Sequence, residues 1–328
     1  MKVGIVSFAH GHANAYASSL VSMDDVELVG IYDDVPEQGK EAASRFHTIY
    51  FRSYQELLSK KLDAVIVTSE NAKHLEHVEE AAKAGVAILC EKPLADTITD
   101  AEKMIHVCKE ANVFLQTAFP VRFNEVVRRA KERIDSGEFG KIVAIKGTNR
   151  GKNPGGWFTE KEKSGGGAVI DHTVHVVDVM RWILQDEVAD VYAEIDQFFS
   201  GKSLDDAGIL NFSFTNGVIA TLDCSWSRNE HFPIWGDVTM EFIGTEGTMK
   251  IDAQGQKLSV YDASGIHYQV FADDMDHGLV KDFISRVRSK KAPSITGEDG
   301  LRALEVAIGA YASSEKGERV QLKSFLQT

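Results

Sequence analysis

Glu91-Lys92-Pro93 is the first of two residue groups in this chain whose types and spacing could carry chemistry. It directly follows the apolar run 86–90, which predicts a buried parallel strand. In an open α/β sheet, ligands bind just beyond the carboxyl ends of the strands. A lysine at that place, beside a carboxylate and a proline that restricts the backbone, is a candidate for binding or catalysis. The alternative is a solvent-exposed lysine beside a proline that opens a helix.

The second group lies on a predicted helix over 168–184. Asp171, His175 and Asp178 are spaced i, i+4 and i+7, so they share one face of a helix that is otherwise nearly all apolar. Burying these groups is costly unless they pair or face a cavity, which makes the row a site candidate. His175 is the natural general base, because imidazole titrates closest to neutral pH. Asp171 could orient it or contact a substrate. The alternative is a hydrogen-bonded core histidine.

His172 lies near the same face and raises the question of a metal. His172, His175 and Asp171 could supply ligands, but no fourth ligand or known metal spacing is evident. We therefore predict no metal, and a substrate contact for His172.

Three further features surround this helix. The glycines at 165–167, just before it, predict the close approach of a ligand to the backbone. Trp157 lies in a loop with Phe158 and could stack on a sugar ring or only anchor the loop. Arg122 could bind substrate oxygens or tie two domains together.

A degraded nucleotide-binding loop follows the first predicted strand. Ser7-Phe8-Ala9-His10-Gly11-His12 stands where a G-x-G-x-x-G fingerprint would open the first helix. Serine and alanine at its first two glycine positions are small enough to admit a pyrophosphate, and the helix N-terminus would offer free N–H groups. His12 is a departure, because the third position normally needs a small residue. The plain alternative is an ordinary strand-to-helix turn.

Asp33 strengthens the dinucleotide interpretation. It ends the second predicted strand about 20 residues past the loop, where a carboxylate can bind ribose hydroxyls. Asp34 follows it, and two carboxylates would repel a 2′-phosphate, so NAD is favoured over NADP. Ser69, Asn71 and His74 follow the next parallel strand at the same edge. Asn71 could face the nicotinamide ribose or cap a helix, and His74 could line the cleft or lie on the surface.

Composition limits the class of protein and its partners. The chain has 328 residues, 43% of them hydrophobic, and a net charge of −13 from 36 basic and 49 acidic residues. With no basic cluster, nucleic acid and anionic membrane are poor partners. No apolar run approaches the ~18 residues of a membrane span, and no signal peptide is evident. Cys90, Cys108 and Cys224 lack metal spacing and predict buried, reduced thiols. We expect a cytoplasmic protein.

The chain divides into two halves with different periodicity. Over 1–119, short apolar strands alternate with helices, which predicts a Rossmann-type parallel sheet. The predicted strands are 3–6, 26–32, 64–68, 86–90 and 113–116, and the helices lie near 12–21, 37–46, 53–60, 73–84 and 97–111.

Over 120–328, after a connecting helix near 122–136, period-two runs predict a large, open, mostly antiparallel sheet with helices at 168–184, 277–289 and about 298–314. The expected strands are 142–148, 191–199, 209–214, 218–226, 238–243, 248–251, 258–261 and 268–271. Asn216-Gly217 predicts a hairpin with a type I′ turn. Because helices cover one face of this sheet, we expect the other to be buried in a homodimer or homotetramer.

These features, in this order, resemble the Gfo/Idh/MocA family of oxidoreductases over essentially the whole chain. Glu91-Lys92-Pro93 and the Asp-x-x-x-His pattern of Asp171 and His175 after a glycine run are the most specific matches. The resemblance implies NAD(P)-linked oxidation of a hydroxyl of a sugar, sugar derivative or cyclic polyol to a ketone. It implies that His175 takes the hydroxyl proton, that Lys92 polarises the oxygen and helps to place the nicotinamide, and that Asp171 supports both.

Two other functions remain open at this point. Some relatives keep the cofactor bound and redox-cycling for elimination or glycoside cleavage, and others use the fold as a non-enzymatic sugar or nucleotide sensor. A sensor needs neither base nor lysine, so the intact Lys92, Asp171 and His175 argue against it. Unranked substrate contacts are Trp226, Arg228, His231 and Trp235.

Overall fold

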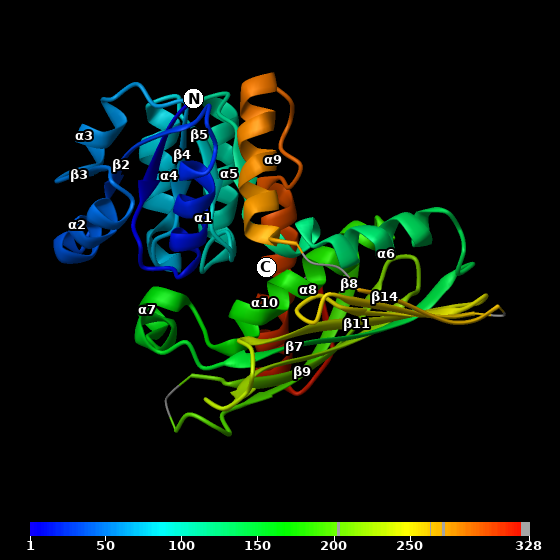
Figure 1. The fold of residues 1–328 in the computed structure, drawn as a ribbon. Helices are drawn as coiled ribbons and strands as arrows, with labels where there is room; N and C mark the ends of the chain where they lie inside the picture. Colours follow the sequence, from blue (N-terminus) through cyan, green and yellow to red (C-terminus); the bar gives the residue numbers. More distant parts are fainter. Residues whose placement is uncertain (202–203, 263, 271–272, 323–328) are drawn as a thin grey trace. The chain divides into compact units, whose positions relative to one another are not determined.

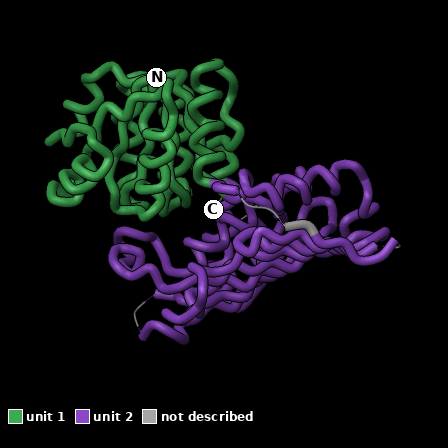
Figure 2. Tube along the Cα trace, viewed as in Figure 1, with its two compact units in different colours: residues 1–120, 276–301 green, residues 121–275, 302–328 purple. Residues whose placement is uncertain are grey.

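A computed structural model of the chain describes residues 1–201, 204–262, 264–270 and 273–322, without the side chains of 269 and 270. These residues form two compact units, one of residues 1–120 with 276–301 and one of residues 121–275 with 302 onward (Figure 2). Each unit contains one sheet, of six strands in the first and nine in the second (Figure 1).

The sheet of the first unit is wholly parallel, in the order β3-β2-β1-β4-β5-β6. Its strands are β1 (Lys2–Val6), β2 (Glu27–Tyr32), β3 (Ile49–Phe51), β4 (Ala64–Val67), β5 (Ala87–Cys90) and β6 (Leu115–Thr117). This is the dinucleotide-binding order, and its direction reverses between β1 and β4, where such sheets bind ligands. The predicted Rossmann-type sheet is confirmed, apart from β3, which is too short to be visible as a pattern.

Helices connect these strands and pack on the sheet. They are α1 (His12–Val21), α2 (Pro36–Arg45), α3 (Tyr54–Leu58), α4 (His74–Lys83) and α5 (Ile98–Glu110), with a short 3-10 turn η1 (Asn71–Lys73) before α4. Two of them have hydroxyl caps, because Ser53 Oγ accepts the Glu56 N–H and Thr97 Oγ1 accepts the Asp100 N–H. All residues of β4 and β5 are buried, as expected for strands covered by helices.

One helix of the first unit comes from late in the sequence. We expected 120–328 to form a single domain, but 276–301, with α9 (Met275–Ser289), belongs to the first unit. The ring of Phe283 lies 5.7 Å from that of Phe114, and the Thr117 N–H donates to the Ile295 carbonyl at 3.1 Å. The sequence does not reveal this, because an amphipathic helix has the same periodicity whichever sheet it packs on.

The second unit is built on a nine-stranded sheet in the order β14-β13-β12-β11-β7-β10-β9-β8-β15. Only β7 and β10 pair in parallel among the ladders described, which confirms a mostly antiparallel sheet. The strands are β7 (Ile142–Lys152), β8 (Val188–Asp196), β9 (Ala207–Phe214), β10 (Ile219–Arg228), β11 (Gly236–Gly244), β12 (Thr248–Asp252), β13 (Lys257–Asp262), β14 (Gly265–Val270) and β15 (Val320–Gln321). Phe271, predicted within the β14 strand, lies outside the described residues.

The helices of this unit are α6 (Glu125–Asp135), α7 (Lys161–Ser164), α8 (Ala168–Leu184) and α10 (Gly297–Lys316), with 3-10 turns η2 (Pro120–Phe123) and η3 (Gly156–Thr159). Of these, α6, α8 and α10 lie where helices were predicted, whereas the short α7 was not predicted. The boundary between the units at residue 301 falls within α10.

The two faces of the large sheet differ. On β10, Leu222, Cys224 and Trp226 are buried toward α8, where Thr173 Oγ1 donates to Cys224 Sγ at 3.5 Å. On the opposite face, Ile209 and Ile219 are exposed. Period-two alternation therefore places one row of β10 side chains against α8 and leaves the other row on the open face. Cys90, Cys108 and Cys224 are all buried and free, as predicted.

Two local predictions were wrong in detail. The Asn216-Gly217 hairpin forms between β9 and β10, but only Gly217 has a positive φ (88°), and its N–H bonds to the Phe214 carbonyl. The turn is thus type I with a left-handed glycine after it, not type I′. The strand predicted to reach 199 ends at Asp196, because the Asp206 carboxylate accepts the N–H groups of the three residues 198–200 and turns the chain away.

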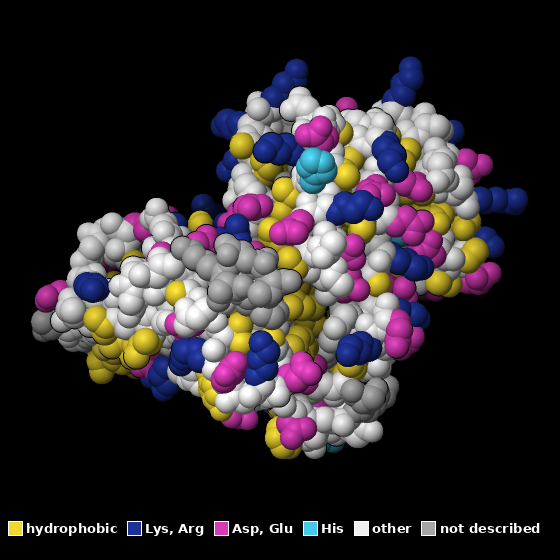
Figure 3. Space-filling view, turned by 180° about the vertical axis from the view of Figure 1, so that it is seen from behind, with side chains coloured by type: hydrophobic (Ala, Val, Ile, Leu, Met, Phe, Trp, Pro, Cys, Tyr) yellow, Lys and Arg dark blue, Asp and Glu magenta, His cyan; other side chains and the backbone are white. Residues whose placement is uncertain are grey.

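Charges are mixed over the surface. On the side seen in Figure 3, Lys and Arg side chains are interspersed with Asp and Glu rather than gathered in one basic patch. Among the described residues, no helix combines the length and hydropathy needed to cross a membrane.

Candidate functional site

The predicted nucleotide loop lies at the carboxyl end of β1, as expected. Ser7 adopts a left-handed conformation (φ 70°) that glycine takes most easily. Its carbonyl accepts a 2.6 Å hydrogen bond from Thr68 Oγ1, at the end of β4. The tight turn at the first glycine position of the fingerprint is therefore made by a serine that the adjacent strand holds in place.

Most amide groups of this loop bond within the protein, so fewer N–H donors remain for a ligand than we expected. The Phe8 N–H donates to Asp33 Oδ2 at 2.6 Å and the Ala9 N–H to Ser7 Oγ at 3.1 Å. The His10 N–H donates to the Thr68 carbonyl at 3.0 Å, and the His12 N–H to His10 Nδ1 at 3.1 Å. The acceptors come from the loop itself and from the ends of β2 and β4, so a pyrophosphate here would compete with them.

Two carboxylates end β2, and they have different environments. Asp33 is buried and also accepts the Val35 N–H at 2.7 Å; burial raises its pKa despite these bonds. Asp34 accepts Tyr32 Oη at 2.6 Å and pairs with Lys73 Nζ at 2.7 Å. Burial would raise the pKa of Asp34, but the hydrogen bonds from Lys73 and Tyr32 outweigh it and lower this pKa. Asp33 is thus the acid held against the loop, and Asp34 the acid neutralised by a lysine.

Residues after β4 tie the loops of this edge together. His74 is fully buried, and its Nδ1 faces the carbonyls of Pro93 and Leu94 while its Nε2 faces that of Ser69, each at 3.1 Å. Burial lowers the pKa of His74. Asn71, also buried, opens η1. The contacts of His74 fix the loop after Lys92 and exclude the surface alternative, and its place at the cofactor cleft stays a prediction.

Lys92 follows β5 at the predicted strand end. Its side chain is only 4% exposed, its N–H donates to Glu91 Oε2 at 3.0 Å, and its bond to Pro93 is cis. A lysine this buried requires nearby acceptors or a ligand. The solvent-exposed alternative is excluded.

Glu91 lies at the centre of a hydrogen-bonded cluster with the nucleotide loop. His12 Nδ1 contacts Glu91 Oε1 at 3.0 Å, Tyr16 Oη donates to the same oxygen at 2.6 Å, and His10 Nδ1 lies 3.9 Å away. Burial alone would raise the pKa of Glu91, but the charges of His10 and His12 hold it well below its usual value. The carboxylate is therefore ionised and paired. Sequence reasoning missed this cluster, because β5 and the loop are far apart in the chain.

The start of α8 in the second unit corrects the interpretation of the glycine run. The Asp205 carboxylate accepts the N–H groups of Gly167 and Val169 at 2.9 and 2.8 Å, and Tyr311 Oη donates to it at 2.9 Å. A Cβ on Gly166 would lie 2.4 Å from Tyr311 Oη, and one on Gly167 would lie 1.9 Å from the Asp205 carbonyl oxygen. The glycines thus admit the helix-capping groups of the protein itself, where we expected a ligand.

Asp171 is fixed by two neighbours. Trp226 Nε1, from the end of β10, donates to Asp171 Oδ2 at 3.2 Å, and His172 Nε2 lies 3.3 Å from the same oxygen. His172 Nδ1 faces the Asn149 carbonyl at 2.8 Å. Indole and imidazole therefore hold one side of the carboxylate. His172, predicted to contact substrate, is buried and contacts this acid.

His175 differs from the rest of its helix. Every other residue from Ala168 to Arg181 is buried, whereas His175 is partly exposed. A reactive group must be reachable, and His175 is the member of the predicted polar row that meets this condition.

Asp178, the third member of the row, has a structural partner. Arg122 donates to it through Nε at 2.7 Å and Nη2 at 2.6 Å, and both side chains are buried. Removing one partner of such a pair costs about 3–5 kcal/mol. The contacts shown for Arg122 are thus internal to the second unit, and its predicted role in binding substrate stays a prediction.

The remaining aromatic and basic candidates divide by exposure. Trp157 is partly exposed and stacks on Phe158 at 3.9 Å between ring centroids. Trp226 is buried on Asp171, whereas Trp235 and His231 are exposed, and Arg228 pairs with Asp237. Alternation along β10 could have placed Trp226 on the packed face with Cys224, although not against Asp171.

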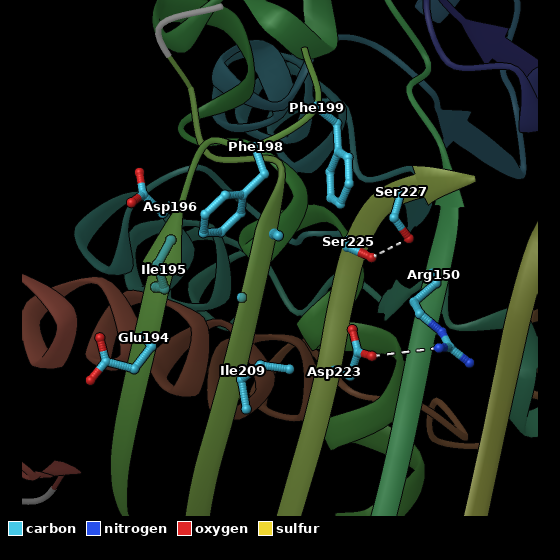
Figure 4. A pocket seen from close by; sticks show the side chains of 12 residues that line it. Arg150, Glu194, Ile195, Asp196, Phe198, Phe199, Ile209, Asp223, Ser225 and Ser227 are labelled. Carbon is cyan, nitrogen blue, oxygen red and sulfur yellow. Dashed lines mark hydrogen bonds and ion pairs between the residues drawn. The ribbon is translucent and has the colours of Figure 1, made fainter. Parts of the chain in front are cut away.

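A separate cavity of about 410 Å³ lies on the open face of the sheet (Figure 4). Phe198 and Phe199 stand over it, and Arg150 pairs with Asp223 at 3.6 Å on its floor. Ser225 donates to Ser227 beside them. It lies across β10 from Asp171, because Asp223 and Ser225 alternate with Cys224 and Trp226.

The strand order of the first sheet defines an α/β protein with a Rossmann-type unit, and comparisons with known proteins identify its family. Residues 1–119 match the oxidoreductase family with an NAD-binding Rossmann fold, and residues 127–250 match the GFO/IDH/MocA C-terminal domain. The chain therefore belongs to the GFO/IDH/MocA family of oxidoreductases, as the sequence predicted.

Individual relatives align over most or all of the chain. It is 28% identical to myo-inositol 2-dehydrogenase of Thermotoga maritima, covering 99% of this chain and all of that protein. It is 30% identical to 2,7-anhydro-N-acetylneuraminate hydratase of Escherichia coli, covering 74% of this chain and 66% of the other. The crystal structure of a probable dehydrogenase from Thermotoga maritima aligns with a TM-score of 0.85 and 27% identity over 99% of both chains.

Proposed function

We propose that this enzyme oxidises a hydroxyl of a sugar, sugar derivative or cyclic polyol to a ketone with NAD. Family membership and the inositol dehydrogenase relative support this substrate class. The observation that carries the proposal is the arrangement of α8, where a partly exposed His175 lies one turn from an Asp171 that Trp226 and His172 hold in place.

The residues at the strand ends of the first unit fit a dinucleotide. Ser7 keeps the glycine-like turn after β1, and Asp33 ends β2, where a carboxylate accepts ribose hydroxyls. Both Asp33 oxygens already accept one N–H each, but a carboxylate has about four lone-pair sites, so capacity for ribose remains. The bound nicotinamide supplies the acceptor for the hydride.

We assign each catalytic side chain one role. His175 takes the proton of the reacting hydroxyl, because it is the accessible base on α8. The Lys92 ammonium polarises the same oxygen and helps to place the nicotinamide, and its burial strengthens the electrostatic effect. Asp171 orients the base and contacts substrate with the side of the carboxylate that faces away from Trp226. Trp157 and Arg122 are proposed substrate contacts.

An assay of cofactor reduction tests the proposal. Purified enzyme with NAD⁺ and a panel of inositols, hexoses, and amino or acid sugars should reduce the cofactor with at least one substrate. Tight NAD⁺ binding without reduction by any of them would contradict a simple dehydrogenase.

A second candidate function follows from the hydratase relative. In that case the enzyme would oxidise its substrate, eliminate or add a group, and reduce the product again, with the cofactor retained. Dinucleotide that co-purifies with the protein, together with product formation and no net change in cofactor redox state, would favour this chemistry.

Removing the indole donor should weaken the support of Asp171. In Trp226→Phe the ring still fills its buried place, but the 3.2 Å hydrogen bond to Asp171 Oδ2 is lost. We expect kcat to fall about tenfold, because a charge-assisted hydrogen bond contributes ~1.5–3 kcal/mol. KM for substrate and Kd for NAD⁺ should both be measured; a drop in NAD⁺ affinity with unchanged kcat would contradict this role.

Cofactor choice should depend on Asp34 and its lysine. We expect NAD⁺ to bind more tightly than NADP⁺, because Asp33 and Asp34 both end β2. In Asp34→Asn, Lys73 loses its 2.7 Å partner and can pair with a 2′-phosphate, so NADP⁺ should bind about tenfold more tightly. The double variant Asp34→Asn/Lys73→Gln is the matched control and should lose this gain. Titration calorimetry with both dinucleotides measures the effect, and equal gains in the two variants would refute it.

We also propose that the open face of the sheet joins copies of this chain in a homodimer or homotetramer. Phe198 and Phe199 are 70% and 59% exposed there, beside exposed Ile209 and Ile219. Light scattering of the purified protein tests this, and a monomer mass at micromolar concentration would exclude it.

A further inference from the structure

We propose that the imidazolium of His12, paired with the buried Glu91 carboxylate, binds the pyrophosphate of the cofactor and makes cofactor affinity fall as pH rises. This rests on the proposed use of NAD and deepens it. It names His12 as the residue that takes over the role of the backbone N–H groups in a glycine-rich fingerprint.

The position of His12 follows from the fold. It opens α1 directly after the β1 loop, at the third glycine position of the fingerprint. Its Nδ1 contacts Glu91 Oε1 at 3.0 Å, and its side chain is 29% exposed. Because Glu91 is fully buried, the exposed part of the ring is the edge away from Nδ1, which carries Nε2. One nitrogen is thus anchored inside the protein while the other can reach a ligand.

A side-chain donor suits this loop, because most of its backbone donors are already used. The N–H groups of Phe8, Ala9, His10 and His12 bond to protein acceptors, as described above. Backbone donors of this loop hold a pyrophosphate in the glycine-rich form of the motif. Here a cationic side chain at the same helix end supplies charge without breaking those bonds.

The surroundings of His12 favour its protonated form. Burial alone would lower its pKa, but the Glu91 charge and hydrogen bond outweigh this and raise the pKa above the usual value. Asp276, at the start of α9, acts in the same direction, and the Lys92 charge opposes it. Tyr16 Oη lies 3.3 Å from His12 Nδ1 and donates to Glu91. His10 Nδ1 lies 3.1 Å from the His12 backbone nitrogen, which donates to it, and 3.9 Å from Glu91 Oε1.

The sign of the pH effect follows directly. Below its pKa His12 is charged and attracts the anionic pyrophosphate; as pH rises through that pKa the charge is lost and binding weakens. By linkage, bound cofactor must hold the His12 proton more firmly and shift the transition to higher pH.

Two rival roles predict different behaviour. If the cluster only packs the loop, substitution lowers stability without changing the pH dependence of binding. Histidine and glutamate also bind metal ions, and in that case a chelator would remove cofactor binding. In the structure the facing atoms of His10, His12 and Glu91 already bond to one another or to the loop, which favours a proton-linked pair.

Titration calorimetry of the whole enzyme with NAD⁺, between about pH 6 and pH 9, tests the proposal. Wild type should show a Kd that rises roughly tenfold across this range, the effect of losing one charge close to the ligand. His12→Gln should bind weakly and with a flat pH profile, whereas His12→Lys should bind tightly and also with a flat profile. His106→Gln, an exposed histidine of α5, is the matched control and should behave as wild type.

The outcomes separate this proposal from the proposed function. A wild-type Kd that stays constant with pH, or a His12→Gln profile like that of wild type, would refute the role of His12 while leaving NAD use intact. Loss of binding with EDTA would assign the cluster to a metal instead. Absence of binding to NAD⁺ and NADP⁺ at every pH would overturn both proposals. If His12→Gln fails to fold, Glu91→Gln provides the test instead. Because this variant lacks the Glu91 charge, its NAD⁺ affinity must fall at a lower pH than that of wild type.

Discussion

Replacing His175 with alanine is expected to lower kcat by about 10³-fold, within the range that general bases contribute. The reason is local to α8, since His175 is the partly exposed base of a helix whose Ala168–Arg181 segment is otherwise buried. Folding should be unaffected, because removing a partly exposed ring opens little core. The measurement is kcat at saturating cofactor with the substrate found by the panel, together with the thermal midpoint and Kd for NAD⁺.

A second histidine of the same unit provides the control. The His267 side chain on β14 is 48% exposed and was not predicted to contact substrate, so His267→Ala should keep wild-type kcat. Near-normal turnover in His175→Ala would end its assignment as the base, and a lowered thermal midpoint in parallel with kcat would indicate a folding defect instead.

Replacing Lys92 with methionine should lower kcat/KM by about 10²–10³-fold, because an ammonium that stabilises developing charge on oxygen is lost. Methionine has similar length and no charge to bury, so at a position 4% exposed the thermal midpoint should hold or rise. Lys109→Met, an exposed lysine of α5, is the matched control. A Lys92→Met enzyme with normal kcat/KM would show that the ammonium has no part in turnover.

Combining the two changes tests whether both side chains act on one hydroxyl. Groups that work as a unit are strongly non-additive, so Lys92→Met/His175→Ala should lose far less than the product of the single losses. Fully multiplicative losses would indicate that the lysine and the histidine serve separate steps, and the shared-oxygen mechanism would fail.

The sequence predicts most of the fold for a simple reason. The β4 and β5 strands are short apolar runs between amphipathic helices, a pattern that few folds other than a doubly wound parallel sheet accommodate. The same logic places Ser7, Asp33 and Lys92 at strand ends, because the carboxyl edge of each strand is fixed once the strand is known. The polar row on α8 is visible because polar residues stand out on an apolar helix.

What the sequence could not supply is which polar group meets which. Asp171 depends on Trp226, which lies 55 positions away on another element. The glycines before α8 predict a close approach, but only the fold shows that Asp205 and Tyr311 make it. Likewise the N–H groups of Phe8, Ala9 and His12 donate to side chains whose rotamers no local pattern specifies. Long-range pairing depends on tertiary contacts, which periodicity does not encode.

The late return of α9 to the first unit has a practical consequence. The polypeptide passes between the two bodies at 120, 275 and 301, so no single cut releases an intact nucleotide-binding module. A fragment ending at Phe119 would leave Phe114 without the Phe283 ring and strip β6 of its Ile295 neighbour, exposing an apolar flank prone to aggregation. A chimera that takes its cofactor-binding unit from a relative must therefore replace residues 1–120 and 276–301 together.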